Sequence, residues 1–205
     1  MYIYSPKYDT ITISPESGAQ LLQIQTFIDL DQDGNKEILL NTYAPGNMGI
    51  SDVPYNDSSS WLMVLKQTNE FLFKPVENPN TVSSVRVIPL ANKNKTNLLV
   101  FETSGSIDAL TEPMFSVYGI SGNLKERKNM IELGLIAPIR DFFVCPTKNG
   151  MDSYILDKET LYKVDSNLHL KRISKVQEEI GKRILNPFVS KNSFLFYSRN
   201  LQTIF

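Results

Sequence analysis

The sequence contains one cysteine and one histidine, and each scarcity argues against a class of chemistry. Cys145 has no second cysteine with which to form an internal disulfide, and its apolar neighbours, 142–144, predict a small buried residue rather than a reactive thiol. His169 stands between Leu168 and Leu170, an alternation that predicts an exposed strand position. Zinc sites and Ser-His or Cys-His catalytic groups therefore have almost no residues from which to form.

Long apolar runs and a strong net charge are also lacking. No run of about 18 apolar residues exists, so the sequence predicts no membrane-spanning helix. The formal net charge of −1 gives no general attraction to nucleic acid or to a membrane surface. A basic cluster at 171–183 is interrupted by Glu178 and Glu179, which favours a solvated face. The first residues lack the basic start and apolar core of a signal peptide, so we expect a cytoplasmic protein or an excerpt of a longer chain.

One stretch, residues 29–37 with the sequence DLDQDGNKE, specifies a piece of chemistry. Calcium takes roughly 6–8 oxygen ligands at about 2.3–2.6 Å, and alternating carboxylates in a loop with a glycine turn supply such oxygens. The stretch is not an EF-hand, because counting from the first aspartate places Leu40 at the twelfth loop position, where a glutamate is required. The alternative is a polar hairpin turn, since Asp, Asn and Gly all favour turns.

Residues 27–40, FIDLDQDGNKEILL, resemble the FG-GAP (VCBS) repeat of integrin-α-type β-propellers, in which a loop of this pattern joins two strands of a blade. The resemblance implies an all-β propeller of four-stranded antiparallel blades, a bound Ca²⁺ as cofactor, and an extracytoplasmic location. In that location calcium concentrations are high enough to fill a site of modest affinity. It also implies the metal ligands, which are Asp29, Asp31, Asp33, the Asn35 carbonyl and Glu37.

Short strand-like runs continue along the chain and group into units of four. We expect one domain over 1–205, with units at about 18–80, 81–136 and 137–175 and partial units at 1–17 and 183–205. Residues 154–165 align without gaps on 194–205, and a period near 40–50 residues with four strands per repeat is typical of propeller blades. This predicts about four blades, or an excerpt of a larger propeller. One short helix is expected at 174–181.

The units also predict a single calcium site. Placing Asn97 on Glu37 puts Pro89, Ala91 and Lys93 at the positions of the three loop aspartates, and none of these supplies a carboxylate. The third unit offers Cys145, Thr147 and Asn149, which are equally unsuitable.

For function, the sequence favours a non-catalytic recognition or sensory module with a protein or carbohydrate ligand. Two long loops, 44–60 and 103–113, join equivalent strands and should emerge on one face. Candidate ligand-binding residues at the first loop are Tyr43, Asn47, Tyr55 and Asn56, whereas Trp61 is expected in the core. The alternatives are a purely structural scaffold and a propeller glycosidase or lyase. The enzyme would draw its carboxylates from Asp52, Asp57, Asp108 and Glu112.

Overall fold

The computed structural model describes the backbone of most of the chain. The described ranges are 2–5, 8–12, 21–44, 55, 58–79, 82–92, 95–106, 109–110, 113–135, 139–147, 150–157, 160–175, 188–190 and 193–195. Within these ranges the fold is all-β, and no helix is found. Nor does this part of the chain contain a helix with the length and hydropathy that crossing a membrane requires.

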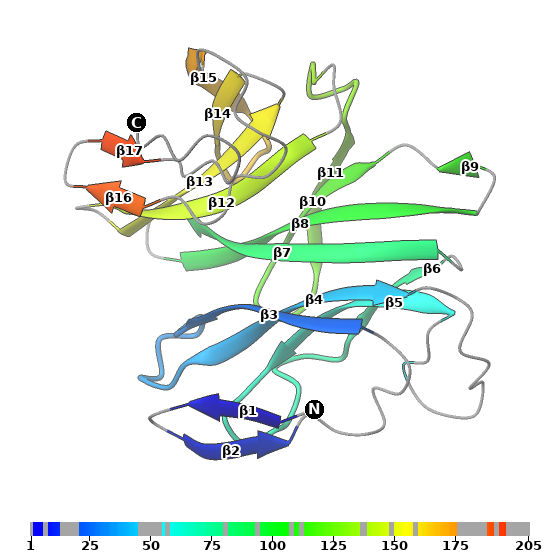
Figure 1. The fold of residues 1–205 in the computed structure, drawn as a ribbon, viewed down its shortest axis with the longest axis vertical. Helices are drawn as coiled ribbons and strands as arrows, with labels where there is room; N and C mark the ends of the chain where they lie inside the picture. Colours follow the sequence, from blue (N-terminus) through cyan, green and yellow to red (C-terminus); the bar gives the residue numbers. More distant parts are fainter. Residues whose placement is uncertain are drawn as a thin grey trace.

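Seventeen strands make up the described fold (Figure 1). They are β1 (Tyr2–Ser5), β2 (Tyr8–Thr12), β3 (Leu21–Ile28), β4 (Glu37–Ala44), β5 (Ser59–Leu65), β6 (Val76–Pro79), β7 (Val82–Asn92), β8 (Lys95–Ser106), β9 (Ala109–Leu110), β10 (Met114–Tyr118), β11 (Leu124–Asn129), β12 (Ile139–Thr147), β13 (Gly150–Asp157), β14 (Thr160–Val164), β15 (Leu170–Lys175), β16 (Phe188–Ser190) and β17 (Ser193–Leu195).

Twelve of these strands form three antiparallel meanders of four strands each. Unit 1 is β3-β4-β5-β6, unit 2 is β7-β8-β10-β11, and unit 3 is β12-β13-β14-β15. Their bounds lie within the ranges 18–80, 81–136 and 137–175 expected from the sequence. The hairpins β1-β2 and β16-β17 form two further, separate sheets.

Units 1 and 2 join, together with β9, into one nine-stranded sheet that curls into a half-barrel. The two units join at β4, where the pairing of one strand edge divides between two partners. The opposite edge of β4 pairs along its length with β3. The divided edge pairs with β5 at Ile38–Leu40 and then with β7 at Thr42–Ala44. We call this divided pairing the β4 junction.

Side chains complete the hydrogen bonding where β5 leaves the β4 junction. The Thr42 hydroxyl donates to the Trp61 carbonyl oxygen at 2.8 Å and accepts from the Trp61 amide at 2.9 Å. The Ser60 amide donates to Ser83 Oγ, and the Val87 amide donates to Asn41 Oδ1. Buried backbone groups without partners are costly, so these short polar residues replace the missing ladder bonds.

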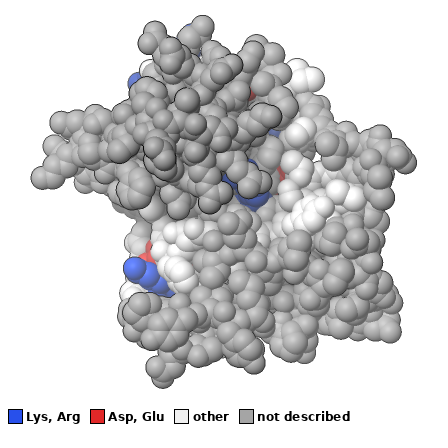
Figure 2. Space-filling model, viewed as in Figure 1, with Lys and Arg blue, Asp and Glu red and all other residues white. Residues whose placement is uncertain are grey.

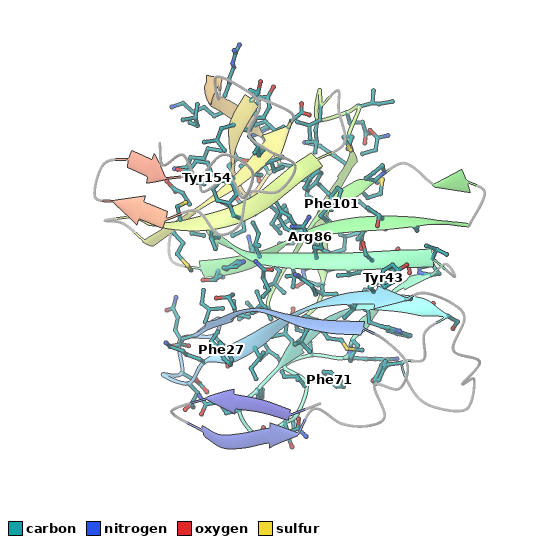
Figure 3. All side chains as sticks on the ribbon, in the orientation of Figure 1. Phe27, Tyr43, Phe71, Arg86, Phe101 and Tyr154 are labelled. Atoms are coloured by element: carbon teal, nitrogen blue, oxygen red, sulfur yellow. The ribbon has the colours of Figure 1, made fainter. Side chains whose placement is uncertain are left out.

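The three units stack with apolar side chains on both faces of each sheet. Alternate residues of a strand point to opposite faces, and in unit 2 both sets are buried. One set, including Val87 and Val100, packs against unit 1, and the other, including Ile88 and Phe101, packs against unit 3. Figure 1 shows the four-stranded sheet lying over β7, and in Figure 3 Arg86 and Phe101 lie on that side of the nine-stranded sheet.

The turn between the third and fourth strands has the same geometry in all three units. Its first residue donates its amide to the carbonyl of the fifth residue and accepts from the amide of the fourth. The fourth residue has a positive φ in each case: 67° at Asn69, 77° at Gly122 and 56° at Leu168. The turns occupy 66–70, 119–123 and 165–169. Three turns of identical hydrogen bonding give an alignment of the units that does not depend on sequence similarity.

That alignment confirms the pairing of Asn97 with Glu37 expected from the sequence. Ile38 pairs with Leu65 just before the turn of unit 1, and Leu98 pairs with Tyr118 just before the turn of unit 2. The preceding residues, Glu37 and Asn97, are therefore equivalent. In unit 3 Ser153 pairs with Val164, which makes Asp152 the third member of the set.

Several local expectations differ from the structure. The apolar run 71–73 has the pattern of a strand and would be the last strand of unit 1. Only Phe71 forms a bridge, however, and β6 begins at Val76, because Pro75 has no amide to donate to the ladder. The expected loop 103–113 instead begins with the end of β8 and contains β9. Ser174 and Lys175, expected to begin a helix, end β15, and residues 176–181 lie outside the described ranges.

The single cysteine and histidine are found as follows. Cys145 is 1% exposed, which confirms the buried position, and burial with the nearby Asp152 charge raises the pKa of its thiol to about 11. His169 is exposed, as expected, but it closes the turn before β15 instead of lying within a strand. Trp61 packs with Tyr55 at the edge of the core, as expected for a structural residue.

Candidate functional site: the β3–β4 loop

The loop between β3 and β4 brings carboxylates from its two ends together. Oxygen atoms of Asp29, Asp31 and Glu37 lie within 4.8 Å of one another, and this is the one such acidic group among the described residues. Asp29 directly follows β3, and Glu37 begins β4. The antiparallel pairing of Ile28 with Glu37 holds the two ends of the loop side by side. The geometry of the sheet, rather than the loop alone, therefore assembles the group.

Hydrogen bonds within the loop fix its course. The Gly34 amide donates to Asp29 Oδ2 at 3.1 Å, and the Asp33 amide donates to Asp31 Oδ1 at 3.2 Å. Gly34 has a φ of 90°, a left-handed conformation that glycine adopts without steric cost. The Asp29 and Asp31 carboxylates thus hold the loop in its course.

Asp33 and Asn35 bind each other. The Asn35 backbone amide donates to Asp33 Oδ1 at 2.7 Å, and its side-chain amide donates to Asp33 Oδ2 at 3.2 Å. These two bonds, in that order, lower the pKa of Asp33. The sequence placed all five residues in one ligand set. The structure gathers three of them, with the Asp33 carboxylate lying outside that group and facing Asn35.

Glu37 is the buried member of the group, with 2% of its surface exposed. Burial raises the pKa of its carboxyl, and the nearby Asp31 charge raises this pKa further. The hydrogen bond from the Leu30 amide to Oε2, which is 2.7 Å long, opposes the rise. A buried carboxylate beside other carboxylates is unfavourable without a compensating positive charge.

One atom of the group has no partner at all. Asp29 Oδ1 is buried and accepts no hydrogen bond, while the other oxygen of the same carboxylate is bound by Gly34. Among the described residues no lysine or arginine forms an ion pair with any of the loop carboxylates. The donor set of hard oxygen atoms and the unpartnered oxygen both fit a hard cation such as calcium.

In units 2 and 3 a lysine contacts the residue that is equivalent to Glu37. Asn97 Oδ1 accepts from Lys125 Nζ at 2.6 Å, and Asp152 Oδ2 lies 2.6 Å from Lys163 Nζ. The equivalent polar residue of the second strand thus contacts a positive charge in units 2 and 3. In unit 1 the same position is occupied by Glu37, which contacts no lysine of the described ranges.

Two of the four residues expected to bind a ligand, Tyr43 and Tyr55, lie in the described part of the chain. Tyr43 is 40% exposed at the end of β4 (Figure 3). Tyr55 packs edge-on against Trp61 and Phe71, with ring centroids 5.0 and 5.4 Å away. Asn47 and Asn56 lie outside the described residues, as do the four acids considered for catalysis, Asp52, Asp57, Asp108 and Glu112.

Two hollows in the described surface were not foreseen from the sequence. One, of about 630 Å³, is lined by Tyr55, Trp61 and the segment 74–77. The other, of about 330 Å³, adjoins the β3–β4 loop and is lined by Asp31 and Gln32 of unit 1 and by polar residues of unit 2, including two lysines. We call the latter the loop cavity.

The surface charge elsewhere is mixed. Figure 2 shows only small, separate groups of acidic and basic atoms on the face displayed, so the described residues there form no continuous basic surface of the kind that nucleic acid requires.

No protein-family model, curated protein or solved structure matches this chain.

Proposed function

We propose that the chain is a β-propeller-type module in which the β3–β4 loop binds one Ca²⁺, and that it serves in recognition rather than catalysis. The observation that carries the metal site is the group of three carboxylates with the buried, unpartnered Asp29 Oδ1. Asp29, Asp31 and Glu37 would hold the ion, and Asp33 and Asn35 lie close enough in sequence to complete the set.

The propeller assignment is supported by the organisation of the three units. Each is a four-stranded antiparallel meander, each uses the same turn before its last strand, and successive units bury their faces against each other. Stacking of blades through two apolar faces is the arrangement that a propeller requires.

Calcium in this loop would have a structural effect. The ion would neutralise carboxylates that repel one another and would tie the end of β3 to the start of β4. Extracellular modules bind calcium with dissociation constants of about 10⁻⁴–10⁻³ M, so an exported location would keep such a site occupied.

Thermal unfolding with calcium and with a chelator tests the site. Calcium at a hundredfold excess over its dissociation constant should stabilise the folded chain by about 2.7 kcal/mol, because the ion binds the folded state alone. Asp31→Ala should remove that increment with little other cost, since Asp31 is exposed. Glu126→Ala, which removes an acidic residue of β11, is the control and should keep the full calcium effect. A chain whose midpoint is the same with calcium and with chelator would refute the site.

A further inference from the structure

The loop cavity has the features of a binding site for a small anion. Its volume of about 330 Å³ lies at the lower end of the range of small-molecule pockets, about 300–1,000 Å³. It lies between two units, which is a common position for ligand sites. Unit 1 contributes Asp31 and Gln32, and unit 2 contributes the start of β8 and the 119–123 turn.

Two lysines supply its positive charge. Lys125 Nζ donates one hydrogen bond to Asn97 Oδ1 and has two further donors for a ligand. Lys95, at the start of β8, is exposed. Neither lysine forms an ion pair with a described residue, although the Asp31 carboxylate also lines the cavity, so both ammonium groups can pair with a ligand.

Contacts within unit 2 hold the side chains that line its part of the cavity. Asn97 is 2% exposed and holds the Lys125 ammonium in place. Ser121 Oγ donates to Asn123 Oδ1 at 2.6 Å. A Cβ at Gly119 would lie 2.4 Å from Asn123 Oδ1 and 3.0 Å from Lys125 Cε, so only glycine lets both side chains fold over the turn.

The balance of charge selects the type of anion. Two ammonium groups favour a negative ligand, while the Asp31 carboxylate on the unit 1 side opposes a multiply charged one such as phosphate. The remaining lining groups include the Thr96 and Ser121 hydroxyls and the Asn123 amide, which exchange hydrogen bonds with ligand hydroxyls.

We propose that the loop cavity binds the carboxylate of a small polyhydroxylated acid, such as a sugar acid, between Lys95 and Lys125. The hydroxyl groups of the ligand bind Thr96, Ser121 and Asn123. The site lies at the end of the units that holds the β3–β4 loop, whereas the ligand loops expected from the sequence join second and third strands, at the other end of each meander. The proposal does not depend on calcium, and its test is carried out in chelator.

Calorimetric titration of the full chain with D-galacturonate, D-galactose and inorganic phosphate tests it. Galacturonate should bind, and galactose, which lacks the carboxylate, should bind at least tenfold more weakly. Lys95→Gln and Lys125→Gln should each weaken galacturonate binding at least tenfold, since each removes a charged hydrogen-bond donor. The control is Lys171→Gln, which removes an exposed lysine of β15 and should leave the affinity within twofold.

Three results would overturn the proposal. They are equal binding of galacturonate and galactose, an equal response of the Lys95→Gln and Lys171→Gln variants, and phosphate binding as tight as that of galacturonate, which would indicate a general anion site. Thermal unfolding of each variant shows whether a loss of binding is a loss of fold.

Discussion

At the scale of single residues, the fourth position of the 119–123 turn is closely restricted. Gly122 has a φ of 77°, and a Cβ there would lie 2.6 Å from the Phe73 ring, which is itself mostly buried. Gly122→Ala should therefore lower the free energy of unfolding by about 2–3 kcal/mol, through backbone strain and a clash in the core together.

Gly34→Ala is the matched control, because Gly34 also has a positive φ but has nothing within 4 Å of a Cβ. Its cost should be about 1 kcal/mol, the backbone contribution alone. Urea unfolding in chelator measures both. Equal losses for the two variants would mean that the contact with Phe73 is unimportant.

The stability that Asp165 gives to the turn of unit 3 depends on pH. Burial opposes ionisation of this carboxyl, but hydrogen bonds from the His169 and Asn167 amides outweigh it, and the pKa of Asp165 is lowered. A lowered pKa in the folded state means that the carboxylate contributes stability above its unfolded pKa of 3.8, and that this stability is lost as the pH falls through the folded pKa.

Asp165→Asn should accordingly lower the free energy of unfolding at pH 5.5, by no more than about 0.5–1 kcal/mol because the carboxylate is half exposed, and by clearly less at pH 3, measured by urea unfolding. Glu126→Gln, which removes a half-buried carboxylate of β11 that lies 3.8 Å from Lys128 Nζ, serves as the comparison. A cost for Asp165→Asn that grows towards pH 3 would contradict the direction of the shift.

At the scale of the elements, one hydroxyl makes two of the side-chain hydrogen bonds of the β4 junction. Thr42 is 2% exposed, and its side chain binds both the amide and the carbonyl of Trp61. Thr42→Val keeps the shape of the side chain but removes the partner of two partly buried backbone groups, so it should lower the free energy of unfolding by about 1–3 kcal/mol.

Thr68→Val is the control, since the Thr68 hydroxyl is exposed and binds only Glu70. It should change stability by less than about 0.5 kcal/mol in the same denaturant titration. Similar values for the two valine variants would show that water or another group satisfies Trp61 once Thr42 is replaced.

At the scale of the whole molecule, the stacked units should unfold together. Trp61 is the only tryptophan, so its fluorescence reports unit 1, while far-UV circular dichroism reports all strands. Phe142 lies in unit 3 and packs on Phe101 and under the Arg86 guanidinium of unit 2, with 6.0 Å between the rings and 4.6 Å from the guanidinium carbon to the ring.

Phe142→Ala should lower stability by about 3–5 kcal/mol and should move the Trp61 transition and the dichroism transition by the same amount. Ile173→Ala, at a position 43% exposed on β15, should move both by less than about 1 kcal/mol. A Trp61 transition that does not respond to Phe142→Ala would mean that units 1 and 3 unfold independently.

The parts of this molecule that were predictable are those determined by neighbouring residues. The spacing of Asp29, Asp31 and Glu37 about a glycine predicts a loop that gathers carboxylates, and the turns at 66–70, 119–123 and 165–169 follow from polar residues between apolar runs. The apolar run 71–73 was misleading. The run is apolar because Phe73 packs into the core, and not because the segment forms a paired strand.

The loop cavity could not be predicted. Asp31 and Lys125 are far apart in the chain and meet only because unit 1 packs against unit 2. No periodicity marks Lys95 or Lys125, and exposed lysines near turns are common. A site formed between units can be recognised only in the folded structure, whereas the ligands of a single loop can be recognised as a pattern of nearby residues in the sequence.

The β4 junction also has a consequence for how the chain reaches its fold. Most strands pair with the next strand along the chain, through short turns that close in microseconds. The pairing of β4 with β7, Thr42 with Val85 for example, closes a loop that holds all of β5 and β6 and so carries a larger entropic cost. We expect the meanders to form first and the β4 junction to form late, so that the slow step of folding is the closure of unit 1 onto unit 2.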